Sequence, residues 1–301
     1  MAINLSGTAG VTPTQWTTAG RPANPNLGQS GWNTTIGGLE FYIGNGSWQT
    51  VASTAYAIDY LLVAGGGGGF YGGGGAGGLL SGSSISVSPG TSYSIIIGAG
   101  GVGNSSKGSD STALGLTAVG GGSAQGTRSN AIMSGGSGAG NQFSAGNSGV
   151  LGSATAGQGY QGGYGGDGVS AYTSGGGGGG AGGAGATTGS STGGVGGIGL
   201  ASSITTSSVY YAGGGGGGTN SGSGAAGGSG GGGAGGNGSG SSGTANTGGG
   251  GGGNASNGTN GGSGIVIIRY LGSAARASGG TITITGGYVI HTFTSSGTFI
   301  A

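Results

Sequence analysis

The chain has 301 residues, 96 of them glycine, and only nine charged side chains, five Lys or Arg and four Asp or Glu. With a formal net charge of +1 these groups form no basic stripe, which argues against a nucleic-acid partner. The absence of cysteine excludes a disulfide framework and thiolate metal sites, and four prolines without a strict third-residue glycine exclude collagen.

Residues 1–55 have ordinary complexity, and this part of the chain carries all three tryptophans. The turn Asn45-Gly46 separates two short runs, 39–43 and 48–51, and Asn-Gly between such runs predicts a β-hairpin. About 50 residues make a marginal core on their own. We therefore expect an N-terminal β module that attaches the chain to another protein or trimerises.

Residues 56–271 form the second predicted domain, which is bracketed by the apolar strands 57–63 and 264–270. A hairpin is expected at 84–88 and 91–97, joined by Pro89-Gly90, with alternate residues on one buried face. The rest consists of glycine runs separated by small polar segments at nearly regular intervals, which indicates a repeat architecture.

Residues 272–301 predict a C-terminal β-hairpin, with strands 281–285 and 288–294 around the turn Gly286-Gly287 and a last strand at 298–300. Apolar runs throughout the chain are short and rich in β-branched or aromatic residues, so essentially no α-helix is expected. The longest runs are far below the ~20 residues of a membrane helix, and the first residues lack the features of a secretory signal. We expect no membrane insertion.

The glycine region has too few side chains to be ordered by apolar burial, because each ordered residue costs about 1–2 kcal/mol. Without Cβ atoms, however, extended left-handed threefold helices can approach closely enough for their N–H and C=O groups to pair. Alanines, the smallest departure from glycine, interrupt runs of comparable length. We therefore predict an ordered block of glycine helices rather than a flexible linker.

Several motifs resemble the glycine-rich domain of bacteriophage tail-fibre proteins and adhesins. They are the strand with its glycines at 60–69, the segments 72–78, 95–101 and 261–270, and a C-terminal segment at 287–299. Residues 20–48 are similar to a short module of phage tail and fibre proteins. The resemblance implies an all-β or irregular fold: a polyglycine II helix sandwich with flanking β-hairpins and a small N-terminal β module.

The same resemblance implies a role in host attachment. The expected partners are a bacterial outer-membrane protein or surface glycan, bound by loops between stacked glycine helices, and other phage tail or fibre proteins, bound by the N-terminal module. A monomer and a homotrimer both stay open. The implied location is the virion tail, after assembly in the host cytoplasm.

Enzymatic motifs are weak. GxGxxG patterns arise by chance in so glycine-rich a chain, and Lys107 follows Ser106 rather than the glycine of a phosphate-binding loop. Residues 162–170 match one calcium-binding nonapeptide, but such sites need tandem copies. His291 lies in an alternating strand without catalytic company, and the four carboxylates are scattered. We expect no enzyme, cofactor or metal, and a packed or edge-facing histidine.

Candidate binding residues follow if successive glycine helices run antiparallel, since alternate loops then share one end of the block. One such set of loops spans 127–134, 169–174, 200–212 and 237–247, and it carries large side chains with small neighbours, which is typical of binding surfaces. The predicted receptor contacts are Arg128, Ile132, Met133, Tyr172, Ile204, Val209, Tyr210 and Tyr211. For Tyr210 and Tyr211, capping of the glycine layers is an equal alternative.

Two other functions stay open. The chain could be a purely structural virion component, in which the glycine block is a rigid spacer and another protein binds the receptor. An ice-binding glycine-helix protein is a more distant alternative, because such proteins usually carry disulfides and this chain has no cysteine.

Overall fold

The computed structural model describes residues 13–35, 38–50, 55–103, 106–124, 130–141, 150–166, 174–188, 191–254, 256 and 258–301. The chain divides into two compact units. Unit 1 comprises residues 1–56 and 87–91, and unit 2 comprises residues 57–86 and 92–301. Most of the described chain is irregular, part of it is β-sheet, and essentially none is α-helix.

Unit 1 contains a four-stranded sheet with the order β1-β2-β3-β4. The strands are β1 (Gln15–Trp16), β2 (Ser30–Asn33), β3 (Gly38–Gly44) and β4 (Ser47–Thr50). The predicted hairpin is confirmed, since β3 and β4 are antiparallel and are joined by Asn45 and Gly46, whose φ angles are 53° and 73°. Both values lie in the left-handed region that Asn and Gly tolerate best.

A buried carboxylate organises the interior of unit 1. Glu40 on β3 accepts hydrogen bonds from the indole of Trp16 and the amide of Asn33, and it pairs with Arg21. Arg21 Nη2 and Nε lie 2.6 and 2.9 Å from the two carboxylate oxygens, a bidentate arrangement. These bonds, led by the one from Arg21, lower the pKa of Glu40 to about 2.

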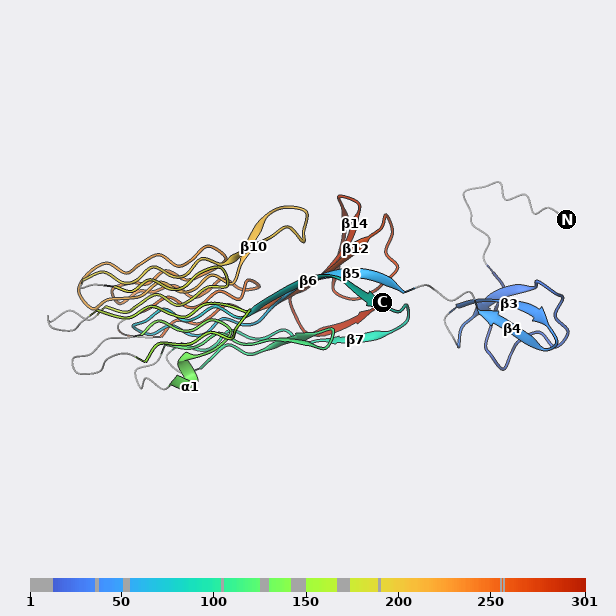
Figure 1. Ribbon diagram of the computed structural model, residues 1–301, viewed down its shortest axis with the longest axis horizontal. Helices are drawn as coiled ribbons and strands as arrows, with labels where there is room; N and C mark the ends of the chain where they lie inside the picture. Colours follow the sequence, from blue (N-terminus) through green and yellow to red (C-terminus); the bar gives the residue numbers. More distant parts are fainter. Residues whose placement is uncertain are drawn as a thin grey trace. The chain divides into compact units, whose positions relative to one another are not determined.

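Unit 2 is built on a five-stranded sheet with the order β13-β14-β12-β5-β6 (Figure 1). Its strands are β5 (Tyr56–Val63), β6 (Leu79–Val87), β12 (Ile265–Leu271), β13 (Thr281–Thr285) and β14 (Tyr288–Phe293). The two predicted bracketing strands, β5 and β12, are antiparallel neighbours. They are apolar on both faces because both faces of the sheet are covered there, and Leu61, Leu62, Val266 and Ile267 are buried.

The C-terminal hairpin is confirmed: β13 and β14 pair around Gly286-Gly287, and β14 also pairs with β12. The hairpin predicted around Pro89-Gly90 is wrong in its pairing. Its second strand, β7 (Ser92–Ile95), pairs with the last strand, β15 (Gly297–Ile300), rather than with β6. A strand distant in sequence displaces the local partner because it supplies Phe299, which is fully buried.

The remaining described elements of unit 2 are short. The strands β8 (Ser111–Ala113) and β9 (Leu116–Ala118) form one hairpin, and β10 (Leu200–Ser202) and β11 (Val209–Tyr211) form another. The single helical turn is α1 (Asn130–Met133). Among the described residues no helix has the length and apolarity needed to cross a membrane.

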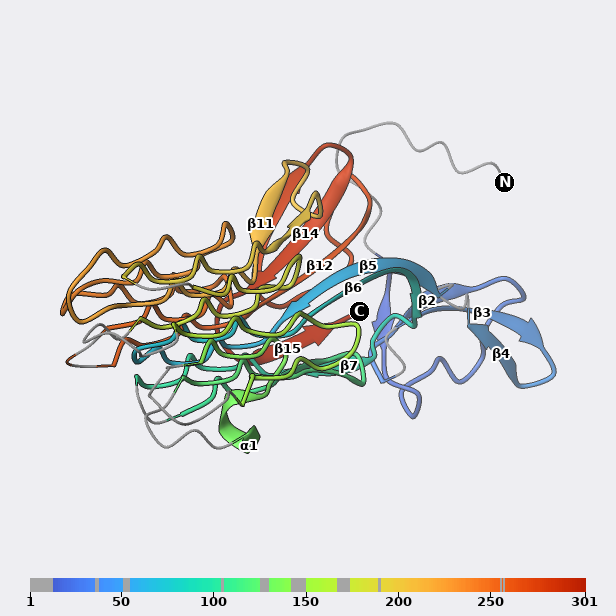
Figure 2. The same ribbon diagram turned by 60° about the vertical axis from the view of Figure 1, so that its left-hand side comes forward.

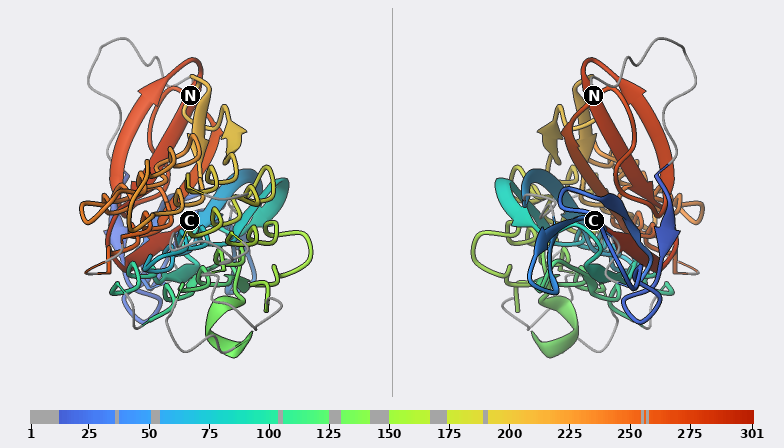
Figure 3. Two further views of the ribbon diagram at one scale, coloured as in Figure 1. Left: turned by 90° about the vertical axis from the view of Figure 1, so that its left-hand side faces the viewer. Right: turned by 90° about the vertical axis from the view of Figure 1, so that its right-hand side faces the viewer.

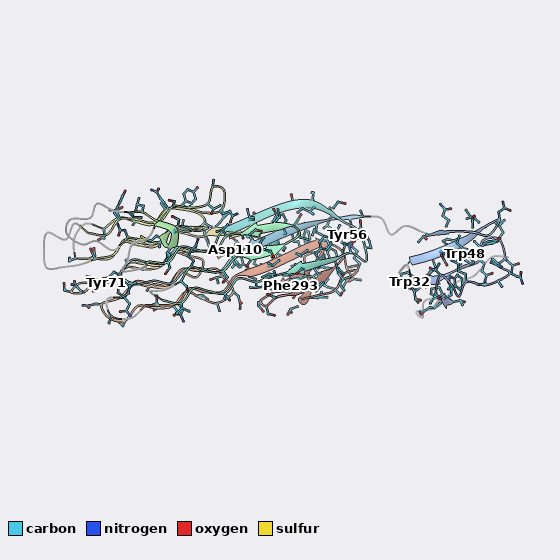
Figure 4. The ribbon with its side chains drawn as sticks, turned by 90° about the horizontal axis from the view of Figure 1, so that it is seen from below. Trp32, Trp48, Tyr56, Tyr71, Asp110 and Phe293 are labelled. Atoms are coloured by element: carbon cyan, nitrogen blue, oxygen red, sulfur yellow. The ribbon has the colours of Figure 1, made fainter. Side chains whose placement is uncertain are left out.

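Between these elements the chain passes back and forth in extended segments that lie side by side (Figures 1 and 2). We call these segments, between residues 64 and 264, the glycine block. Figure 3 shows them end-on. One end of the block, the sheet end, joins the strands near Asp110, and Tyr71 marks the opposite, far end (Figure 4).

Hydrogen bonds within the block repeat with a period of three residues. In the segment 72–78, every third residue donates its N–H to the same neighbouring segment, with N···O distances of 2.8–3.0 Å. The bonds, donor first, are Gly73 to Gly176 and Ala76 to Gly179, Gly74 to Gly251 and Gly77 to Gly248, and Gly75 to Gly122 and Gly78 to Val119. The segment 72–78 thus donates to three different neighbours, unlike a strand, which has two.

Glycine is required because the segments touch through their backbones. A Cβ atom on Gly74 would lie 2.2 Å from the carbonyl oxygen of Gly67, and one on Gly215 would lie 2.0 Å from that of Gly251. Real Cβ atoms essentially never approach backbone so closely. Larger side chains occur where one of the three sides of a segment faces solvent and not a neighbouring segment. In 193–199, Val195 and Ile198 lie three residues apart and are 51% and 45% exposed.

Candidate binding surface

The structure separates the predicted receptor contacts. Arg128 and Tyr172 lie outside the described residues. Ile132 and Met133 belong to α1, where the carbonyl of Ile132 accepts a hydrogen bond from Ser123 and the side chain of Met133 is buried against Ala124 and Ala139. Of this pair only Ile132, which is half-buried, presents any side-chain surface.

The other four predicted contacts lie on the β10–β11 hairpin and its loop. Ile204 and Tyr211 are each only 6% exposed, because they pack into the core with Leu61 and Ile267 of the sheet. Burial also raises the pKa of the Tyr211 hydroxyl. Val209 and Tyr210 are exposed, the latter at 44%. The hairpin therefore offers one face to the core and the other to solvent.

These two groups of residues do not meet. The views agree that α1 lies along one side of the glycine block, whereas the β10–β11 hairpin lies beside β12 and β14 (Figures 1 and 3). The expected alternation of loops between two ends is therefore wrong for 200–212. Two glycine runs contain a reversal that composition hides: Gly180 donates to Gly183, and Gly230 and Gly231 have φ angles of 97° and 94°. After each such reversal, the loops that follow lie at the opposite end of the block from the one expected.

An apolar surface at the sheet end was missed by the sequence reasoning. Leu79, Tyr160, Ala181 and Leu200 line a cavity of about 280 Å³, and both Tyr160 and Leu200 are exposed. The exposed Ile198 is only two residues before Leu200 in the chain. The available signal was the pattern Gly-Gly-Val-Gly-Gly-Ile-Gly at 193–199, which places side chains at every third position.

A polar groove was also missed. Asp59 of β5 and Arg269 of β12 are paired in register, and Arg269 Nε lies 3.0 Å from Asp59 Oδ2. Two cavities adjoin this ion pair, with volumes of about 250 and 330 Å³. The first is also lined by Ser81, Ser83 and Ser203, and the second by Arg276 and Tyr288. The signal was a charged residue in each of the two apolar bracketing strands.

The residues considered for chemistry have structural partners. His291 is fully buried, with Nδ1 2.7 Å from the carbonyl of Gly279 and Nε2 3.3 Å from the hydroxyl of Tyr270. It is therefore a packed histidine, and burial lowers its pKa. Asp110 accepts a hydrogen bond from the backbone of Gly120, and Asp167 lies outside the described residues. Within the described ranges, no three His, Asp or Glu side chains gather as a metal site would require.

Comparison with known proteins identifies the class of the chain. Residues 43–271 match the family described as glycine-rich domain, and the chain belongs to this family. The match covers both bracketing strands and the whole glycine block. No curated protein and no solved structure matches the chain.

Proposed function

We infer that the segments of the glycine block are polyglycine II helices, stacked as a sandwich. The observation that supports this is the three-residue period of the hydrogen bonds, since a left-handed threefold helix directs successive N–H groups to three neighbours in turn. The segment 213–218 has the same pattern: Gly214 and Gly217 donate to 197 and 194, and Gly215 and Gly218 donate to 74 and 71.

Amide hydrogen exchange measured by NMR tests this inference. Gly194 and Gly197, which donate to Gly175 and Gly178, are expected to exchange at least about 100-fold more slowly than Val195 and Ile198 in the same segment, whose N–H groups make no hydrogen bond to the described residues. The four amides form an internal control. Uniformly fast exchange would show that the block is not held by backbone pairing, and uniformly slow exchange would contradict the threefold pattern.

We propose that the chain is a phage tail-fibre or adhesin component that recognises a bacterial surface receptor. The resemblance to such proteins and the membership of the glycine-rich family support it, together with a backbone-bonded block that can hold loops rigidly. Among the predicted contacts that the structure describes, Val209 and Tyr210 on the outer face of the β10–β11 hairpin are the exposed ones. Tyrosine provides a large contact area with little side-chain entropy to lose.

The test is adsorption of the full chain to cells. Labelled protein is expected to bind a subset of Gram-negative strains, and Tyr210→Ala should weaken that binding about tenfold or more, with Ser207→Ala as the control on the same exposed hairpin. Loss of adhesion with the glycine block still folded would confirm the contact.

The structural alternative makes the opposite prediction. If the chain is a rigid spacer in the virion, immunogold labelling would place it on phage particles, while the purified protein would bind no strain. In that case a change of Tyr210 would leave host range unaltered.

A further inference from the structure

We propose that the polar groove beside the Asp59–Arg269 pair binds an acidic saccharide. The proposal rests on the groove alone and holds whether or not the chain is an adhesin. Its first support is the distribution of charge. Only nine side chains of the sequence are charged, yet the cavity of about 330 Å³ is lined by Asp59, Arg269 and Arg276. The two guanidinium groups exceed the one carboxylate, which favours an anion.

The second support is the set of hydrogen-bonding atoms that the protein leaves unused. Arg269 donates through Nε to Asp59 and through Nη1 to the carbonyls of Ser203 and Ile204. Within the described chain, Arg269 Nη2 and Asp59 Oδ1 have no hydrogen bond, although their side chains are 20% and 29% exposed. The ion pair thus keeps one unused donor and one unused acceptor. Hydroxyl groups of a sugar ring can satisfy both, because each can donate and accept.

The third support is how firmly these groups are held. The Arg269 guanidinium lies 4.3 Å from the ring centroid of Tyr288, and its contacts with Ser203 and Ile204 bridge from β12 to the β10–β11 loop. A cation held by a ring, a carboxylate and two carbonyls is pre-organised, so a ligand pays little to order it. The side chains of Ser81 and Ser83 are exposed on β6, the strand beside β5, and their hydroxyls make no hydrogen bond to the described residues.

A purely structural role, in which the Asp59–Arg269 pair only joins β5 to β12, accounts for fewer of these features than a ligand site does. An exposed pair contributes about 0–1 kcal/mol to stability, and Arg269 already bonds to the hairpin without needing the open cavities. A purely structural pair also gives no reason for hydroxyl groups along the cavity wall. These features together are those of a ligand site, where a few placed polar groups converge in a concavity.

The experiment is calorimetric titration of the full chain with four-residue oligosaccharides. The acidic probes are alginate, polygalacturonate and hyaluronan fragments, and the neutral probe is maltotetraose. At least one acidic probe is expected to bind, at least tenfold more tightly than the neutral one, and more weakly as salt is raised. Ser81→Trp fills the groove and should weaken binding tenfold or more. Ser86→Trp, on the same strand outside both cavities, should change it less than twofold.

A second variant separates charge from shape. Arg276→Gln should remove the preference for the acidic probe while the protein stays folded. Melting is measured alongside, because the change also removes the stacking of Arg276 on Tyr270 and its bond to the Leu271 carbonyl. The proposal is overturned if no acidic probe binds, if maltotetraose binds equally well, or if Ser81→Trp binds as the wild type does while remaining folded. Saccharide binding without adsorption to any cell would support the groove and count against the proposed adhesin role, so the two can fail separately.

Discussion

Replacing Gly215 by alanine is expected to destabilise the glycine block by more than about 3 kcal/mol. The new Cβ would lie 2.0 Å from the carbonyl oxygen of Gly251 and 3.1 Å from the backbone nitrogen of Gly74. Neither neighbour can move aside, because the C=O and N–H of Gly74 are bonded to Gly215 and Gly251 in turn. Relief of the clash must therefore break several bonds at once, and scanning calorimetry of the full chain measures the loss.

Gly272→Ala is the matched control. It is the same chemical change, but the nearest atoms to its Cβ would be 3.5 Å away, which is ordinary contact. We expect the transition of unit 2 to shift by less than about 0.5 kcal/mol in this variant. Equal effects of the two substitutions would mean that the block is loosely packed, and that close backbone approach is not what demands glycine.

The second large effect is expected in unit 1, where Glu40→Gln should clearly lower the urea midpoint at neutral pH, since it removes the buried carboxylate that pairs with Arg21 and accepts bonds from Trp16 and Asn33. The pH dependence has a definite sign. Because the pKa of Glu40 falls to about 2 in the folded state from its usual 4.5, its contribution is fully present above pH 4.5 and is lost as the pH falls toward 2.

Tryptophan fluorescence isolates this effect, because all three tryptophans lie in residues 1–56 and Glu40 is the only acidic side chain there. Urea titrations at pH 7, 4.5 and 2.5 should show nearly equal wild-type stability at the first two pH values and a fall at pH 2.5, with a nearly flat profile in Glu40→Gln. Asp59→Asn removes a carboxylate from unit 2 instead, and it should leave the tryptophan transition unchanged. A wild-type profile that is flat below pH 4.5 would contradict the buried ion pair.

Local features were predictable from the residues. Asn45-Gly46 and Gly286-Gly287 require positive φ and fall between alternating runs, so both hairpins could be located. The strands 57–63 and 264–270 were recognisable from their apolar, β-branched composition. The pairing of β7 with β15 was not, because it joins segments about 200 residues apart, and Pro89-Gly90 suggested a nearer partner.

The candidate binding surface was harder to predict than the fold. Glycine carries no side chain to mark a bend, so the reversals at 180–183 and 230–231 look like any other part of a run, and they decide which loops share an end. Met133, Ile204 and Tyr211 are of residue types that are common in binding surfaces. They are buried here, however, because other parts of the chain pack over them. The groove likewise depends on a partner, since Asp59 and Arg269 are 210 residues apart.

By itself, therefore, the amino-acid sequence predicted a chain with almost no helix, with short apolar strands and with turns at Asn45-Gly46 and Gly286-Gly287. It also predicted a region that only backbone contacts could order. Tertiary structure alone decided which backbone groups meet, which tyrosines face solvent and where the few charges converge. The physical reason is that turn and strand preferences act within a few residues. The backbone N–H and C=O groups of one glycine are instead nearly equivalent to those of any other glycine. Which group each of them bonds to is therefore decided by the packing of the whole block.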